Sequence, residues 1–338
     1  MDVTATAPLL PRYRRPLSFG GVLDETFWVY RTAWPKLMAV TGLAALPGAL
    51  AIVLLTGQTY LLSVNNLASL EEDPEAMARL FTGIGLGALL AVLVYGLGAL
   101  IGQGGVTAMT GGLVRGQTPS VAAALGAAFR KLLIVLASGI VLVLGILGLY
   151  LVSLPLLIVG LGGLLGGLVM LIGLAVWVNR PPERRGNGLK WLIILACPFG
   201  LALFYGVRWS LAIPAIFLEN AGPVAALKRS GNLVEGRWFV VFGVWLVLGV
   251  VVFILQSIPA ALIGLAGTLI GASAGDPEGA GLAVGIAQNA ASIAGSILFG
   301  SLSFIAATIM FVDARNRLEG TDLAERLDLL QDGAPALT

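Results

Sequence analysis

Long stretches without a charged residue dominate this sequence and limit what it can fold into. The longest, residues 132–178, holds 47 residues with no Asp, Glu, Lys or Arg. A helix that crosses a bilayer needs about 20 apolar residues. Only 11% of the chain is charged and its mean hydropathy is +0.95, whereas soluble domains contain about 25% charged residues. Such a chain cannot cover a water-facing surface, so we expect an all-α, polytopic transmembrane helical bundle.

Six apolar runs carry the expected spans. They are residues 37–59, 81–114, 132–178, 191–218, 239–270 and 282–312. The run 132–178 is long enough for two spans, divided near Ser153 and Pro155, which makes seven hydrophobic segments. The four Lys or Arg residues of the loop 180–190 favour the cytoplasmic side, as do Lys228, Arg229 and Arg237 after the run 191–218. That run would then begin and end on the same side, and its 28 residues cannot cross twice. We predict six full spans plus one extra hydrophobic segment, either 155–178 or 191–218, with seven spans as the alternative.

Three shorter segments carry apolar residues on one helical face, and we predict that they lie as amphipathic helices in the membrane interface. They are residues 22–34, 119–131 and 223–238. The alternative is that they are the ends of long spanning helices. Each precedes a long apolar stretch at a spacing of about 100 residues, which predicts three pseudo-repeat units. Their approximate limits are 18–118, 119–222 and 223–318.

The distribution of charge predicts the domain organisation and the orientation. We expect a disordered cytoplasmic N-terminus (1–16), a single membrane domain (17–318) and a cytoplasmic C-terminal tail (319–338). Basic residues in both terminal segments favour the inside, and the acidic loop 71–75 favours the outside. The predicted location is a bacterial cytoplasmic membrane, crossed several times.

Charged residues within or beside the apolar runs are candidate functional or structural sites, because a charge in a bilayer is costly. They are Asp24, Glu25, Arg208, Glu219, Lys228, Arg229, Asp313, Arg315, Glu319 and Asp322. Arg208 is the only basic residue deep in an apolar run, and the alternative to a functional role is a structural ion pair with a carboxylate on another helix. The charged segment that begins at Asp313 is predicted to be a solvated helix leaving the membrane, with weak i, i+4 pairs such as Asp313 with Arg317.

Reaction centres are hard to find in this sequence. It contains no histidine and one cysteine, Cys197, inside an apolar run. Asp24 and Glu25 are adjacent on a helix and would point about 100° apart, so they would not converge on one substrate. No Walker loop, HExxH, CxxC or GxSxG motif is present. We therefore predict that the chain is not an enzyme and binds neither a cofactor nor a metal.

Three stretches together resemble a bacterial membrane family. The first runs from Leu17 to Glu25 and is followed by Tyr30 and Arg31. The second contains Arg208-Trp209, Pro214, Glu219, Lys228-Arg229-Ser230, Leu233 and Gly236, and the third contains Asp313, Arg315, Glu319-Gly320 and Asp322-Leu323. This pattern resembles the glycerophosphoryl diester phosphodiesterase membrane domain family. The resemblance implies a stand-alone membrane domain, commonly of six spans, without the soluble phosphodiesterase domain.

These observations favour a non-catalytic membrane module that binds lipid or organises partner proteins. The expected partners are membrane lipids and other membrane proteins, not nucleic acid. One alternative is a transporter or export subunit for an anionic or lipid-like substrate, favoured by Arg208 and by the prolines inside the apolar runs. A further alternative, an intramembrane enzyme acting on lipid, would need Asp24, Glu25, Glu219 or Asp313 as its acid or base.

Overall fold

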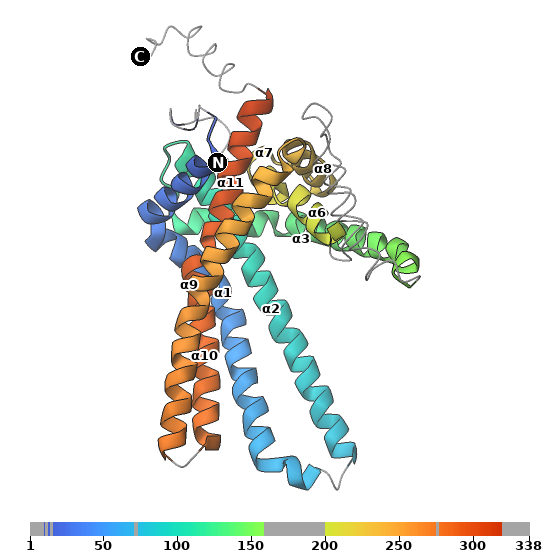
Figure 1. Cartoon of the computed structure of the whole chain (residues 1–338), viewed down its shortest axis with the longest axis vertical. Helices are drawn as coiled ribbons and strands as arrows, with labels where there is room; N and C mark the ends of the chain where they lie inside the picture. Colours follow the sequence, from blue (N-terminus) through green and yellow to red (C-terminus); the bar gives the residue numbers. More distant parts are fainter. Residues whose placement is uncertain are drawn as a thin grey trace, which may run out of the picture. The chain divides into compact units, whose positions relative to one another are not determined.

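The structure is a computed structural model that describes residues 10, 13, 16–70, 74–158, 200–274 and 277–319 (Figure 1). The described part of the chain is helical, as predicted, and contains no strand. Its helices are α1 (Phe19–Leu70), α2 (Pro74–Val114), α3 (Val121–Ile158), α6 (Gly200–Trp209), α7 (Ala212–Glu219), α8 (Pro223–Val234), α9 (Trp238–Ala274), α10 (Pro277–Phe299) and α11 (Ser301–Glu319). Asp322, Cys197 and the basic loop 180–190 lie outside the described residues.

Five of the described helical stretches are long and apolar enough to cross a membrane. They are Phe19–Leu55, Thr82–Val114, Val121–Gly148, Trp238–Leu269 and Val284–Glu319. A sixth is obtained if Leu203–Glu219 and Pro223–Val234, bent by 118°, are taken as one broken span. The predicted class, a helical protein with several membrane-crossing segments, is confirmed at this level. The prediction of six crossings plus one extra segment depends on residues 159–199, which are not described.

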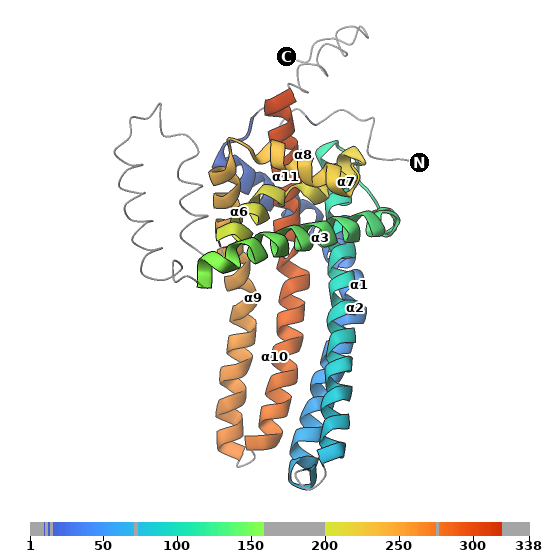
Figure 2. The same ribbon diagram turned by 90° about the vertical axis from the view of Figure 1, so that its right-hand side faces the viewer.

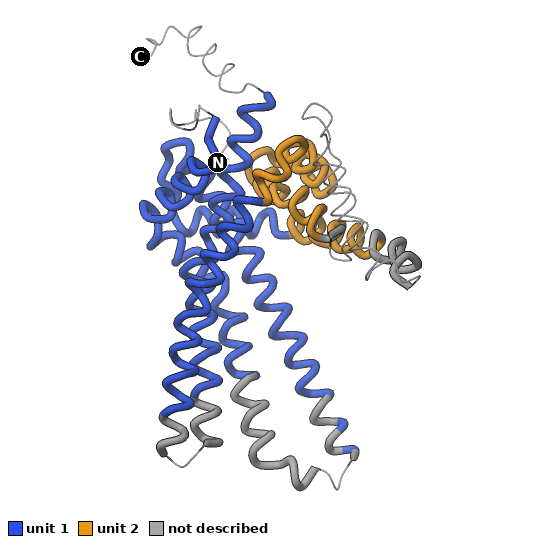
Figure 3. Tube along the Cα trace, viewed as in Figure 1, with its two compact units in different colours: residues 1–132, 243–338 blue, residues 133–242 orange. Residues whose placement is uncertain are grey.

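The chain divides into two compact units (Figure 3). Unit 1 contains residues 1–132 and 243–338, and unit 2 contains residues 133–242. In unit 1, α1 and α2 form one long hairpin, and α9 and α10 form another (Figure 2). The unit limits differ from those of the predicted pseudo-repeats, because the first and last thirds of the chain pack together.

Helix α11 is the most buried element of unit 1. It contacts α1, α2 and α10, and its side chains are buried almost without interruption from Ser301 to Ala314. The prediction that the helix is solvated from Asp313 onwards is therefore wrong for Asp313 and Asn316, which are both buried. The Asp313 carboxylate is held inside the unit by the hydrogen bonds described below, one of which joins it to Leu17, far away in the sequence.

Two of the three predicted amphipathic helices are not separate elements. Residues 22–34 are the first part of α1, which continues through Pro35 and Pro47, and residues 121–131 are the first part of α3. Phe27 and Trp34, on the predicted apolar stripe of α1, are 41% and 48% exposed. The face of α1 that packs inward is a neighbouring stripe of smaller residues, which are Val22, Thr26, Val29, Ala33, Leu37 and Val40. Phe27 and Trp34 therefore lie on the outer face of α1, whereas smaller side chains on the neighbouring stripe pack closely against other helices.

The third predicted segment contains a separate helix, α8, whose predicted apolar stripe is buried except at Val224, which is 64% exposed. Leu227, Gly231 and Val234 are buried, whereas Lys228 and Asn232 are exposed. Within unit 2, α8 packs against α6 and α7, so protein covers much of its apolar face. Pro223 occupies the first turn, where its missing N–H leaves no hydrogen bond unmade.

Candidate functional site

A helix break between α10 and α11 is the first element of the site in unit 1. Gly300 separates the two helices, and its N–H donates to the Ser296 carbonyl at 2.9 Å. A side chain at position 300 would place its Cβ 2.5 Å from that carbonyl oxygen, so glycine is required for this geometry. A break inside an apolar helix leaves backbone carbonyls that need other donors, because lipid supplies none.

Two hydroxyl groups of α1 supply those donors. Tyr30 Oη donates to the Leu298 carbonyl at 2.9 Å, and Thr41 Oγ1 lies 3.0 Å from the Ile297 carbonyl. Thr41 Oγ1 is also 3.0 Å from the carbonyl of Leu37 in its own helix, so its single proton is shared between acceptors. Helix α1 therefore stabilises the break through side chains that are 256 and 268 residues away from their acceptors.

A pocket of about 170 Å³ lies beside the break, among α1, α2, α10 and α11. It is lined by Thr41, Ala45, Tyr95, Gly98, Ala99, Gly102, Gln103, Ser296, Ile297, Gly300 and Phe304. None of these lining residues is charged, and most of them are apolar. All of them belong to helices that are apolar enough to cross a membrane. The pocket is therefore a cavity of the membrane-spanning part of unit 1.

Two polar side chains of this lining have unused hydrogen-bonding capacity. Among the described residues, neither the Gln103 amide nor the Tyr95 hydroxyl makes a hydrogen bond. Ser296, by contrast, donates its hydroxyl proton to the Ser292 carbonyl at 3.0 Å. Eight residues separate Tyr95 from Gln103, which is about 12 Å along α2. The pocket thus has an apolar wall with one amide and one phenol at different depths.

Close packing between α1 and α2 closes the back of the pocket. A Cβ at Gly98 would lie 2.3 Å from the Ala44 carbonyl oxygen, and one at Gly48 would lie 2.2 Å from the Tyr95 Cα. Backbone atoms leave no room for side chains at these crossings, so glycine is required. Sequence reasoning treated glycines as packing surfaces but missed the pocket. The signal that could have found it is Gln103, a polar amide inside the apolar run 81–114.

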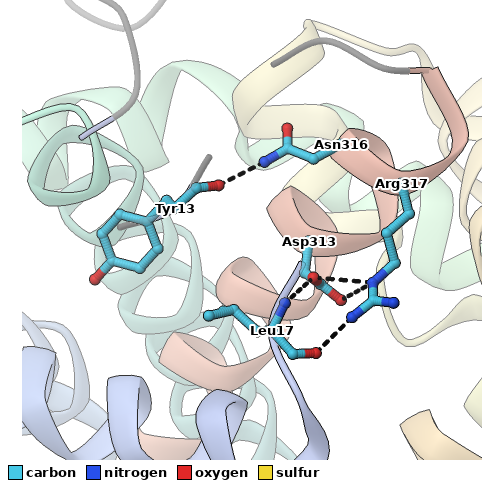
Figure 4. Close-up of polar contacts among 5 residues, drawn as sticks. All are labelled: Tyr13, Leu17, Asp313, Asn316 and Arg317. Carbon is cyan, nitrogen blue, oxygen red and sulfur yellow. Dashed lines mark hydrogen bonds and ion pairs between the residues drawn. The ribbon is translucent and has the colours of Figure 1, made fainter. Parts of the chain in front are cut away.

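The C-terminal candidates hold the N-terminal segment (Figure 4). Leu17 N donates to Asp313 Oδ1 at 2.8 Å, and Arg317 Nη2 donates to the Leu17 carbonyl at 2.6 Å. Arg317 Nε also contacts both oxygens of Asp313 at 3.1 Å, so the predicted i, i+4 pair is present. Asn316 Nδ2 donates to the Tyr13 carbonyl at 2.6 Å. The Asp313 side chain is only 1% exposed, and these donors compensate its burial.

Of the other predicted residues of unit 1, Glu25 contacts this cluster through Tyr13. Glu25 accepts a hydrogen bond from Tyr13 Oη at 2.7 Å, whereas Asp24 is exposed. Glu319, at the end of α11, is exposed too, and Arg315 Nε is buried without a hydrogen-bond partner among the described residues. The structure therefore engages Asp24 and Glu25 differently, as expected for neighbours on a helix.

In unit 2, Arg229 and Arg208 each lie beside a carboxylate. Arg229 binds Glu219 through two hydrogen bonds of 2.8 Å, from Nε and Nη2. Arg208 lies 3.9 Å from Glu235, which follows α8. Lys228 is exposed. Arg208 and Glu219 would share a face on one continuous helix, but the chain breaks at residues 210–211 and sends them to different partners.

Ser230 of α8 stabilises that second break. Its hydroxyl donates to the Arg208 carbonyl at 2.8 Å and accepts from the Leu211 N–H at 3.1 Å. One side chain thus replaces two of the backbone hydrogen bonds that a continuous helix would make. Gly231 follows it, and a Cβ there would lie 3.0 Å from Arg208 Nε. The α10–α11 break and the α6–α7 break are therefore each stabilised by side chains of a neighbouring helix.

Comparisons with known proteins do not assign the chain to a family: no family model, curated protein or solved structure matches it. The resemblance to the glycerophosphoryl diester phosphodiesterase membrane domain family remains a prediction that depends on short motifs. Within the residues that the structure describes, no group of three or more His, Cys, Asp or Glu side chains could hold a metal ion.

Proposed function

We propose that the chain is a non-catalytic membrane module that binds a bilayer lipid in the pocket beside the α10–α11 break. The observation that carries this proposal is the composition of the pocket: apolar walls, no charged side chain, and an amide and a phenol without hydrogen bonds in the described chain. Ligand sites are typically apolar cavities with a few polar groups that fix orientation.

The position of the pocket supports a ligand that arrives from the bilayer. Ala99, at the pocket, is exposed, and so are Leu93 and Leu97 on the same helix. A surface of this kind on a spanning helix faces lipid tails. A solute from water would have to cross this apolar surface, whereas a lipid is already beside it.

The contacts of the charged residues support a structural role for these residues. Arg229, Asp313 and Arg317 are engaged in hydrogen bonds that hold helices or chain segments together. Polar groups used in this way stabilise a scaffold and are not presented to a substrate. This supports a binding or organising module, with lipids and other membrane proteins as its partners.

The topology that we propose for this module has six crossings and one further hydrophobic segment, with both termini on the cytoplasmic side of a bacterial membrane. The exposed Phe27 and Trp34 support an interfacial position for the first part of α1, because aromatic side chains favour that region. The exposed Lys228 supports an interfacial position for α8 as well. We also propose membership of the glycerophosphoryl diester phosphodiesterase membrane domain family, on the sequence motifs alone.

The second candidate function is transport of an anionic or lipid-like substrate. Two broken helices favour it, because discontinuous helices line substrate sites in many transporters. Liposome flux distinguishes the two functions. Flux that is abolished by Arg208→Leu in a folded protein would favour transport, whereas lipid retention without flux favours the module.

Lipid retention in the pocket can be tested with one pair of variants. A diacylglycerol and a phospholipid, each with a photoreactive group near an ester, would be added separately to protein in nanodiscs, and cross-linked peptides would be mapped by mass spectrometry. We expect labels on α2 around Ala99 and on α10 around Ser296. Ala99→Phe should fill the pocket and reduce that labelling several-fold, whereas Ala294→Phe, at an exposed alanine outside the pocket, should not. Labelling that Ala99→Phe leaves unchanged would contradict the proposal.

A further inference from the structure

We propose that the pocket selects an uncharged glycerolipid with a free hydroxyl group, the chemical class of diacylglycerol, over lipids with a charged headgroup. This inference rests on the proposed lipid binding and goes further by naming the ligand. It follows from three properties of the pocket: its charge, its hydrogen-bonding groups and its depth.

The charge of the lining excludes a phosphate. No Asp, Glu, Lys or Arg is among the residues that form the pocket. A phosphate bound there would lose its water without meeting a cation, which is strongly unfavourable. The nearest basic residue along α1, Lys36, is five positions before Thr41 and points about 140° away from it around the helix. An uncharged ligand meets no such cost.

Gln103 matches the polar groups of a diacylglycerol. A primary amide carries two N–H donors and one carbonyl acceptor, and those of Gln103 make no hydrogen bond within the described chain. Diacylglycerol presents an ester carbonyl and a hydroxyl on neighbouring glycerol carbons, so the amide N–H can bind the first and the amide carbonyl the second. A phospholipid has lost that hydroxyl and leaves the amide carbonyl unpaired, which is how a polar site discriminates against an analogue.

Thr41 adds a second acceptor at the same level. A Cβ at Gly102, next to Gln103, would lie 3.7 Å from Thr41 Cα, so the two helices place these side chains at one height. The Thr41 hydroxyl donates its proton to backbone carbonyls, including that of Ile297, and keeps an oxygen lone pair for a ligand hydroxyl.

The depth of the pocket fits the glycerol region of a lipid. Thr41 is five residues beyond Lys36, the last charged residue before the apolar run 37–59, which places it about 7 Å further along α1. The ester groups of a lipid lie just inside the polar boundary. A volume of 170 Å³ corresponds to about six water molecules. It accommodates the glycerol and ester groups, while the acyl chains extend along the exposed leucines of α2.

The test compares two photoreactive lipids with identical acyl chains, a diacylglycerol and a phosphatidylglycerol, in nanodiscs that contain the full chain. For the native protein we expect the diacylglycerol to label the pocket several-fold more than the phosphatidylglycerol at equal concentration. Gln103→Leu should reduce that preference about three- to tenfold, the range expected for one or two neutral hydrogen bonds. Gln256→Leu, the same change at a glutamine of α9 outside the pocket, should preserve it.

The outcomes separate this inference from the proposed function. Equal labelling by both lipids that Ala99→Phe abolishes would overturn the selectivity and leave lipid binding intact. Stronger labelling by the phosphatidylglycerol would overturn it as well. Labelling of the pocket by neither lipid would overturn both proposals. Gel filtration and thermal unfolding of each variant establish that it is folded, and Gln103→Asn, which keeps the amide, serves as a second variant if Gln103→Leu does not fold.

Discussion

The hydroxyl of Tyr30 on α1 donates a hydrogen bond of 2.9 Å to the backbone carbonyl of Leu298, which is 268 residues later in the chain and immediately before a helix break. A carbonyl at this position has lost its partner within the helix and cannot find one in lipid. The hydrogen bond from Tyr30 therefore stabilises the break between α10 and α11 and connects it to α1. The pocket lies beside this break, and Ile297 and Gly300 are among its lining residues.

Removing this hydroxyl should destabilise unit 1. We expect Tyr30→Phe to lower the free energy of unfolding by about 1–2 kcal/mol, because it leaves a partly buried carbonyl without its donor. Unfolding by denaturant in mixed micelles measures the effect. Tyr205→Phe is the control, since the Tyr205 hydroxyl makes no hydrogen bond among the described residues. Equal stability of the two variants would contradict the prediction.

Gly300 should be intolerant of a side chain. Gly300→Ala places a methyl group 2.5 Å from the Ser296 carbonyl oxygen, so the break must rearrange. We expect a loss of more than 1 kcal/mol of stability and a change in pocket labelling. The same substitution at Gly285 on α10 meets open space, and there it should be neutral or stabilising by up to about 1 kcal/mol through helix propensity. A neutral Gly300→Ala would show that the break does not need glycine.

The pair of Arg229 and Glu219 should depend on the shape of the guanidinium as well as on its charge. Arg229→Lys keeps the charge but cannot make both 2.8 Å hydrogen bonds, so we expect it to cost about 1 kcal/mol of stability. A double-mutant cycle with Glu219→Gln measures the coupling between the two side chains. Lys228→Ala, at the exposed neighbour, should change stability by less than about 0.5 kcal/mol. A coupling energy near zero would show that the pair contributes nothing.

Asp313 should keep the N-terminal segment in place. The Leu17 amide is protected by its hydrogen bond to Asp313 Oδ1, so Asp313→Ala should increase hydrogen exchange at Leu17. Asp313→Asn retains one acceptor oxygen and should have a smaller effect. Asp24→Asn, at an exposed carboxylate, should leave the exchange unchanged. The prediction fails if Leu17 exchanges equally fast in the native protein and in Asp313→Ala.

Topology mapping should settle the side of the basic loop. Reporters placed after Val178, at Gly188 and at Asn220 show which side of the membrane each position occupies, and therefore which of the neighbouring segments cross it. With six crossings, a cytoplasmic reporter at Gly188 would identify 191–218 as the extra segment, and a reporter on the outside would identify 155–178. The six-crossing arrangements both place Asn220 on the cytoplasmic side, so a reporter at Asn220 on the outside would favour seven spans.

Parts of the candidate site could be predicted and others could not. The i, i+4 spacing of Asp313 and Arg317 indicated their ion pair. The predicted faces of α8 agree with burial at Leu227 and Val234 but not at Val224. The pairing of Arg229 with Glu219 could not be foreseen, because the chain turns between α7 and α8 and brings together residues that local periodicity keeps apart. The inward-packed stripe of α1, which includes Val22, Thr26 and Val29, was not predicted, because the face that meets other helices depends on how closely those helices approach.

The sequence by itself determined that this chain is a helical protein with several membrane-crossing segments. That conclusion depends on the hydropathy of consecutive residues, which can be summed along the chain without knowing which residues are in contact. The tertiary structure decided where the helices break, which donors satisfy the freed carbonyls and which side chains line the pocket. Tyr30 and Leu298, or Thr41 and Ile297, have no local relationship in the sequence. Only the packing of α1 against the α10–α11 break gives these residues a common role, because a hydrogen bond requires proximity in space, which distance along the chain does not determine.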